Sequence, residues 1–131
     1  PIMSALFLRD AAVIALTAAA DYSAGRGKGV TISGDTATLS ASASTHCRGI
    51  ILEGATSGNQ VIVAIIGAGG GTVPAKLSGT VTKGDKMQQH TDGTWITDAA
   101  SGARVVSLVA LESGVSGDII EAAMLTPITL S

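Results

Sequence analysis

The sequence predicts an all-β fold, either a small antiparallel β-barrel or a sandwich. Short apolar runs alternate with turn signals, most clearly between Lys83 and Met124. Glycine adopts positive φ and aspartate bonds to nearby backbone amides, so pairs of these residues favour tight reversals between neighbouring strands. This stretch has four expected reversals, at Gly84-Asp85, Asp92-Gly93, Ser101-Gly102 and Gly117-Asp118.

Length and composition set the size of this fold. The 131 residues suffice for one compact core, and we expect a single β domain over residues 11–131 after an arm over residues 1–10. The net charge is −2 and no region concentrates Lys or Arg, so we expect no direct contact with nucleic acid. Charged residues make up only 14% of the chain, which predicts that other subunits bury part of its surface.

The first ten residues have no turn signal after Pro1. Such a terminus either packs on its own domain or lies on a partner as an extended arm. The apolar side chains that would make the contact are Ile2, Met3, Leu6, Phe7 and Leu8.

The next segment, residues 11–20, is ambiguous between helix and strand. Its alanines favour a helix, but Val13, Ile14 and Thr17 suit a strand, and we expect a strand because the surrounding pattern is β-like. Ten apolar residues are too few to span a bilayer, which needs about 20, so no membrane partner is expected. A cleaved signal peptide is the alternative, whereas the single cysteine, Cys47, fits synthesis in the cytoplasm.

A loop and then a hairpin are expected in the following twenty residues. Three glycines make residues 21–29 a loop by composition. Apolar and polar residues alternate on both sides of Gly34-Asp35, which predicts a hairpin over residues 30–40 with one solvated face.

Three further strands are expected before the Lys83–Met124 stretch. Residues 49–53 and 60–66 are apolar runs separated by a glycine-containing turn, and the second should be buried on both faces. Residues 72–82 alternate strictly, and Pro74 on the polar side predicts an edge strand.

Residues 61–72, V-I-V-A-I-I-G-A-G-G-G-T, imitate the glycine-rich phosphate turn of a dinucleotide-binding fold. That motif requires a following helix, whose N-terminal amides bind the pyrophosphate. Here the sequel has strand periodicity and a proline, and Thr72 stands where the spacing requires Gly or Ala. We therefore interpret this segment as a loop between strands.

The other candidates for chemistry have structural interpretations. His46 and Cys47 would point to opposite faces of a strand, and His90 has no second histidine at a metal-ligand spacing. Lys86 has methionine on one flank only, unlike the carrier lysine of biotinyl or lipoyl domains. The acidic residues should accept backbone hydrogen bonds in turns, namely Asp85, Asp92, Asp98, Glu112, Asp118 and Glu121.

Trp95 has two interpretations. It is either an aromatic on a binding surface or a partly buried anchor that closes one end of the barrel. In neither case does the sequence predict a catalytic residue, a cofactor or a metal site.

The order of motifs from Gly84 to Leu125 resembles the C-terminal half of the capsid cement, or head decoration, proteins of tailed bacteriophages. The shared features are a Gly-Asp turn before a short strand, an Asp-Gly hairpin leading to Trp95, and an Ala-Leu-Glu strand followed by a Gly-Asp turn and a final apolar strand. The first 45 residues depart from the family pattern.

This resemblance implies a β-tulip-like domain that forms homotrimers on the outer surface of an icosahedral virion. Its partner would be the major capsid protein, whose subunits it would bridge, and many weak contacts repeated over a lattice would add up by multivalency. Pro1–Leu8 would add a strand to that protein. Two alternatives remain, namely a ligand-binding or carrier β domain that accompanies an enzyme, and a non-viral β-module of a fibre or surface array.

Overall fold

The computed structural model describes residues 12–43, 47–67 and 71–131. Within these ranges the protein is all-β, with one short 3₁₀ turn, η1 (Thr91–Gly93), and no α-helix. No helix in this part of the chain is long and apolar enough to cross a membrane. The strands are β1 (Val13–Ala18), β2 (Gly29–Ser33), β3 (Thr36–Leu39), β4 (Gly49–Glu53), β5 (Gln60–Ile65), β6 (Thr72–Lys76), β7 (Lys86–Gln89), β8 (Trp95–Thr97), β9 (Arg104–Ala110) and β10 (Ile119–Leu130).

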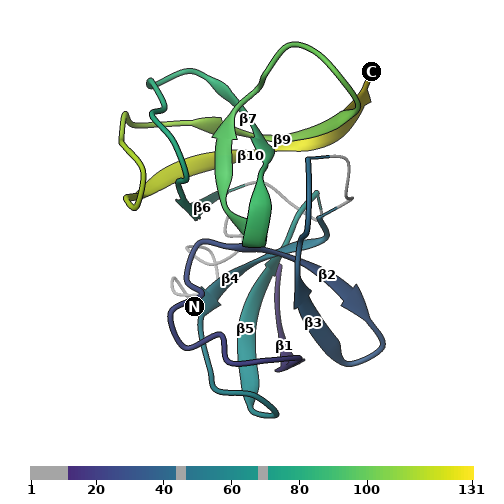
Figure 1. The fold of residues 1–131 in the computed structure, drawn as a ribbon. Helices are drawn as coiled ribbons and strands as arrows, with labels where there is room; N and C mark the ends of the chain where they lie inside the picture. Colours follow the sequence, from purple (N-terminus) through teal and green to yellow (C-terminus); the bar gives the residue numbers. More distant parts are fainter. Residues whose placement is uncertain (1–11, 44–46, 68–70) are drawn as a thin grey trace, which may run out of the picture.

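The first five strands form a closed barrel in the order β1-β3-β2-β4-β5 (Figure 1). Its pairs are antiparallel except for β1 and β3, which close the barrel in parallel through Thr17↔Thr36 and Ala18↔Ala37. The predicted hairpin over residues 30–40 is confirmed by β2 and β3, with Gly34 at positive φ in the turn. The strand expected within residues 11–20 is also confirmed, as β1.

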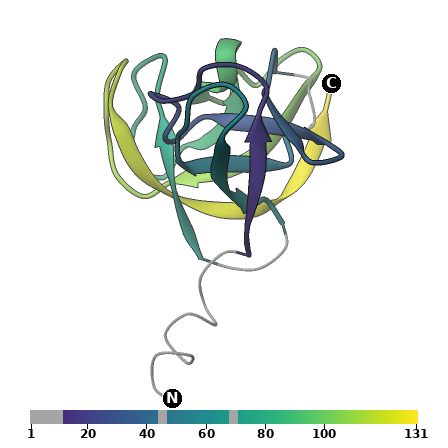
Figure 2. The ribbon, with the colours of Figure 1, turned by 90° about the horizontal axis from the view of Figure 1, so that it is seen from below.

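The last five strands form a second sheet in the order β6-β10-β9-β7-β8. β10 has 12 residues and a register shift between Met124 and Ile128, and Figure 2 shows it as a long curved band along one side of the molecule. The four expected reversals are all present. Each contains a residue at positive φ, namely Gly84, Asp92 with Gly93, Gly102 and Gly117.

The expected strand over residues 72–82 is only half right. β6 lies at the edge of its sheet as predicted, but it ends at Lys76, and beyond it Leu77 and Val81 form isolated bridges to Trp95 and Gly114. The chain bends between these two bridges, which interrupts the ladder, and burial does not alternate along β6, because residues 73–75 are all buried. Pro74 is buried rather than solvated.

The core has two parts that share the wall formed by β4 and β5. Val61 and Val63 pack inside the barrel, whereas Ala64 and Ile66 pack against the second sheet. Burial of residues 60–66 on both faces is thus confirmed in the main, although Ile62 and Ile65 are half-buried. The barrel and the second sheet are held together through this wall.

A junction of hydrogen bonds beside this wall also joins the barrel to the second sheet. The Ser40 amide donates to the Gly29 carbonyl, the Gly93 amide donates to the Ser40 carbonyl, and Gln89 Nε2 donates to the Gly93 carbonyl at 3.1 Å. A Cβ at position 29 would lie 2.5 Å from Gln89 Oε1 and 2.6 Å from Cys47 Sγ. Only glycine therefore fits at position 29.

We predict that Gly29→Ala destabilises the protein by about 1–3 kcal/mol, the usual cost of overpacking a tight interior. Chemical unfolding followed by tryptophan fluorescence measures this change, because Trp95 is fully buried. Gly79→Ala is the matched control, since its new Cβ meets only Ile96 Cγ2, at an ordinary 3.6 Å. Equal stability of the two variants would contradict the close packing inferred at the junction.

Candidate functional site

The residues predicted as the capsid contact, Ile2, Met3, Leu6, Phe7 and Leu8, lie outside the residues that the structure describes. The arm and the division at residue 10 therefore stay predictions. The described chain begins at Ala12 and enters the barrel through β1, whose first residues lie at the lower rim of the molecule in Figure 2. Ala12 is the described residue nearest in the sequence to the predicted contact.

Large exposed apolar side chains mark two regions of the described surface. One is the start of β1, where Val13 is 49% exposed and Ile14 is 41% exposed. The other is the connection between β9 and β10, where Leu111 and Val115 are exposed, with Val115 at 56%. Ile119 and Ile128 on β10 are also exposed. Such side chains are candidates for contact with a partner.

The glycine-rich segment at residues 67–71 is followed by a strand and not by a helix. Gly67 and Gly71 are both at positive φ, and β6 begins at Thr72. The predicted connection between strands is confirmed at its described ends. A helix N-terminus that could bind a pyrophosphate does not follow this segment, which removes the main support for a nucleotide site here.

Cys47 has the buried structural position that the sequence predicted. Its thiol is 3% exposed and donates to the Gly49 carbonyl at 3.1 Å. Burial raises the pKa of Cys47 to about 12, so the nucleophilic thiolate is scarce at neutral pH. His46, the other member of the considered pair, lies outside the described residues.

Four of the six acids accept hydrogen bonds from backbone amides as expected, namely Asp85, Asp98, Glu112 and Asp118. Asp85 Oδ2 accepts from the Thr82 amide at 3.0 Å and from Thr97 Oγ1 at 2.9 Å. Asp118 Oδ2 accepts from the Val115 amide, and Glu112 Oε1 accepts from the amide of Glu121. Asp92 contributes to its turn through a left-handed backbone conformation, at φ 54°. Within the described ranges no three His, Cys, Asp or Glu side chains group in a way that could hold a metal ion.

Three other candidate side chains also have structural positions. Lys86 is the first residue of β7, paired with Val109, and so differs from a carrier lysine at a hairpin tip. His90 Nδ1 lies 3.2 Å from Ser78 Oγ. Trp95 is fully buried in the core between the second sheet and the β4–β5 wall, so the interpretation as a surface aromatic is wrong, and the expected anchor is fully rather than partly buried. The parallel bridge to Leu77 holds it there.

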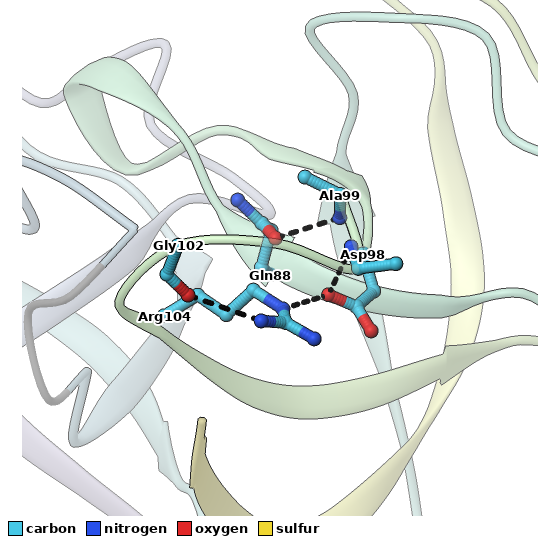
Figure 3. A network of polar contacts seen from close by, with 6 residues as sticks. Gln88, Asp98, Ala99, Gly102 and Arg104 are labelled. Carbon is cyan, nitrogen blue, oxygen red and sulfur yellow. Dashed lines mark hydrogen bonds and ion pairs between the residues drawn. The ribbon is translucent and has the colours of Figure 1, made fainter. Parts of the chain in front are cut away.

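A polar network between β7 and β9, shown in Figure 3, was not predicted from the sequence. The Arg104 guanidinium pairs with Asp98 and donates to the Gly102 carbonyl at 3.0 Å. Gln88 Oε1 accepts from the Ala99 amide at 2.9 Å. The hydrogen bond from Arg104 is the main cause that lowers the pKa of Asp98. The sequence did contain a signal for this pair, because Asp98 and Arg104 carry opposite charges on either side of the Ser101-Gly102 turn.

We predict that Cys47 reacts with a thiol reagent such as DTNB at pH 8 only after the protein unfolds. At a pKa of about 12, about one thiol in ten thousand is ionised at that pH, and the group is also shielded from the reagent. Absorbance at the reagent's product band, with and without urea, measures both rates. A native rate equal to the unfolded rate would show that Cys47 is accessible.

We predict that Asp98→Asn lowers stability at neutral pH and that the loss disappears in acid. The folded pKa of Asp98 lies below its ordinary value of 3.8, so its contribution is present above that value and is lost as the pH falls through the folded pKa. The expected size is at most about 1 kcal/mol, as for solvent-accessible ion pairs. Melting temperatures between pH 7 and pH 2.5 test this. In an Arg104→Gln background the same substitution should have little effect at any pH.

Comparison with known proteins finds likeness at the level of the fold. No family model matches the sequence, and no curated protein matches it. A solved structure described as "The crystal structure of head fiber gp8.5 N base in bacteriophage phi29" matches with a TM-score of 0.65 and 14% sequence identity. The match covers 87% of this chain and 93% of that chain. The protein therefore shares its β architecture with the base of a bacteriophage head fiber.

Proposed function

We propose that the protein is a structural component of a tailed-phage virion that decorates the outer surface of the head and bridges subunits of the major capsid protein. The fold likeness to a phage head fiber base, which extends over 87% of the chain, carries this proposal. The motif order between Gly84 and Leu125 resembles head decoration proteins and supports the same class by a separate argument.

The surface of the described residues fits a protein that works by contact. Apolar side chains are exposed at the start of β1 and around the β9–β10 connection, at opposite ends of the sequence. The turn acids Asp85, Glu112 and Asp118 instead serve the backbone through hydrogen bonds. Repetition of modest apolar contacts over a capsid lattice gives tight overall attachment without any single strong site.

The proposed partners are the major capsid protein and two further copies of this chain. Pro1–Leu8 is the proposed capsid contact, because its apolar side chains suit strand addition to an exposed sheet edge. Self-association is proposed because charged residues make up only 14% of the chain, too few to cover an isolated monomer well, and a homotrimer is proposed because the resemblance to head decoration proteins implies it.

We predict that the purified protein co-sediments with expanded, DNA-free heads of the phage whose genome encodes it, and that deletion of residues 1–8 weakens this binding at least a hundredfold. Burial of two large apolar side chains already provides about that factor. Quantitative gel analysis of the pelleted heads measures occupancy against protein concentration.

Replacement of the same eight residues by Gly and Ser is the control for chain length, and it should bind as weakly as the deletion. Sedimentation velocity of the free protein tests the trimer separately. Absence of binding by the intact protein would refute the proposed function, whereas undiminished binding after the deletion would refute only the role of the arm.

A further inference from the structure

The first half of β1 has one unpaired edge within the described structure. β5 pairs with β1 from Val13 to Thr17 on one side. On the other side β3 pairs only with Thr17 and Ala18. The first residue of β3, Thr36, lies opposite Thr17, so β3 does not extend along the earlier residues of β1. No described strand lies along this second edge between Val13 and Leu16.

The hydrogen bonds of β1 identify the groups that face the open edge. The Thr17 amide donates to the Asp35 carbonyl and the Ala19 amide donates to the Ala37 carbonyl, so these residues face β3. Backbone groups of successive residues in a strand point to alternate edges. Val13 and Ala15, two and four residues before Thr17, therefore direct their N–H and C=O groups to the open edge.

The backbone groups of the even-numbered residues, which point away from the open edge, agree with this assignment. The Ala12 carbonyl accepts from the Ile65 amide at 2.8 Å, and the Ala18 amide donates to the Asn59 carbonyl at 2.8 Å. Even-numbered residues thus face β5. The open edge consequently offers two donors and two acceptors in the register that an added strand requires.

This edge is short, but it has none of the other usual protections against strand pairing. Natural edge strands are commonly blocked by lysine, proline, a bulge or short length. Residues 11–16 read A-A-V-I-A-L, without a charge, a proline or a glycine. The side chains beside the edge are also exposed, with Val13 at 49% and Ile14 at 41%.

We propose that the open edge of β1 is a second docking element, along which an extended, apolar segment of the same capsid subunit that binds the arm adds a strand over Val13–Leu16. This inference rests on the proposed function and names the surface by which the folded body is attached. The eleven residues before Ala12 reach at most about 36 Å, so whatever the arm binds is held close to this edge. Tethering of this kind raises the effective concentration of the second contact. Pairing with a barrel strand would also fix the orientation of the body on the shell.

Two substitutions test the edge without disturbing the barrel. Ala15→Pro removes one donor that faces the open edge and leaves the bonds to β5 intact. Val13→Lys places a charge beside the edge. Thr80→Lys is the control for an added charge, because Thr80 is exposed in the connection between β6 and β7 and belongs to neither of the exposed apolar regions described above.

In the full chain, Ala15→Pro should weaken co-sedimentation with the DNA-free heads by about tenfold, the effect of about one lost backbone hydrogen bond with its neighbouring contacts. Val13→Lys should weaken it by a similar factor, because its charge disfavours strand pairing along the edge. Thr80→Lys should change it by less than twofold. Circular dichroism and melting temperature should match those of the intact protein for all three variants. Hydrogen exchange provides a readout that needs no substitution, since the amides of Val13 and Ala15, which face the open edge, should exchange fast in free protein and slowly on heads.

The outcomes separate this inference from the proposed function. Intact protein that fails to bind heads refutes the proposed function. Intact protein that binds, with β1 variants equal to Thr80→Lys, refutes the docking edge alone. Slow exchange of the Val13 and Ala15 amides in dilute free protein shows that the chain covers its own edge, and loss of self-association in the β1 variants shows that the edge joins copies of this chain. Either result overturns the proposal.

Discussion

The structure depends on one wall of β-sheet that must be buried on both faces. β4 and β5 direct Ile51, Val61 and Val63 into the barrel and Ile50 and Ala64 toward the second sheet. Because the hydrophobic effect scales with the area removed from water, separation of the two halves would expose both the wall and the sheet that covers it.

Close packing at that wall explains why small and polar residues lie where they do. At position 29 a side chain larger than hydrogen would meet Gln89 and Cys47, and Gln89 in turn joins β7 to the carbonyls of Gly93 and Thr94. The Ser40 carbonyl accepts one backbone hydrogen bond from Gly93 in the turn before β8, which links the barrel to that turn. The junction is thus specified by hydrogen bonds as well as by volume, which favours a single arrangement of the two halves.

Because the interior is packed and hydrogen-bonded in this way, the groups that are free to contact a partner lie on the edges and surface of the protein. Some side chains could suggest catalysis in a different fold, but here they have structural roles. The Cys47 thiol and the carboxylates of Asp85 and Asp118 form hydrogen bonds with the backbone. Trp95 is committed to packing, and its Nε1 is buried without a partner. The open edge of β1 differs from them, since its backbone groups at Val13 and Ala15 face no described strand. A fold with this distribution is suited to attachment and assembly.

The sequence by itself determined the local structure. The φ preference of glycine and the hydrogen bonds of aspartate act over a few residues, so the four reversals after Lys83, the Gly34-Asp35 hairpin and the strand at β1 could be predicted from neighbouring letters. Only the tertiary structure decided which strands pair across long separations. The parallel closure of β1 on β3, the end of β6 at Lys76, the burial of Trp95 and the Asp98–Arg104 pair all depend on packing between segments far apart in the chain or on its path between them. Side-chain periodicity reports which face is buried but not the partner that buries it, and for that reason the open edge of β1 was invisible in the sequence.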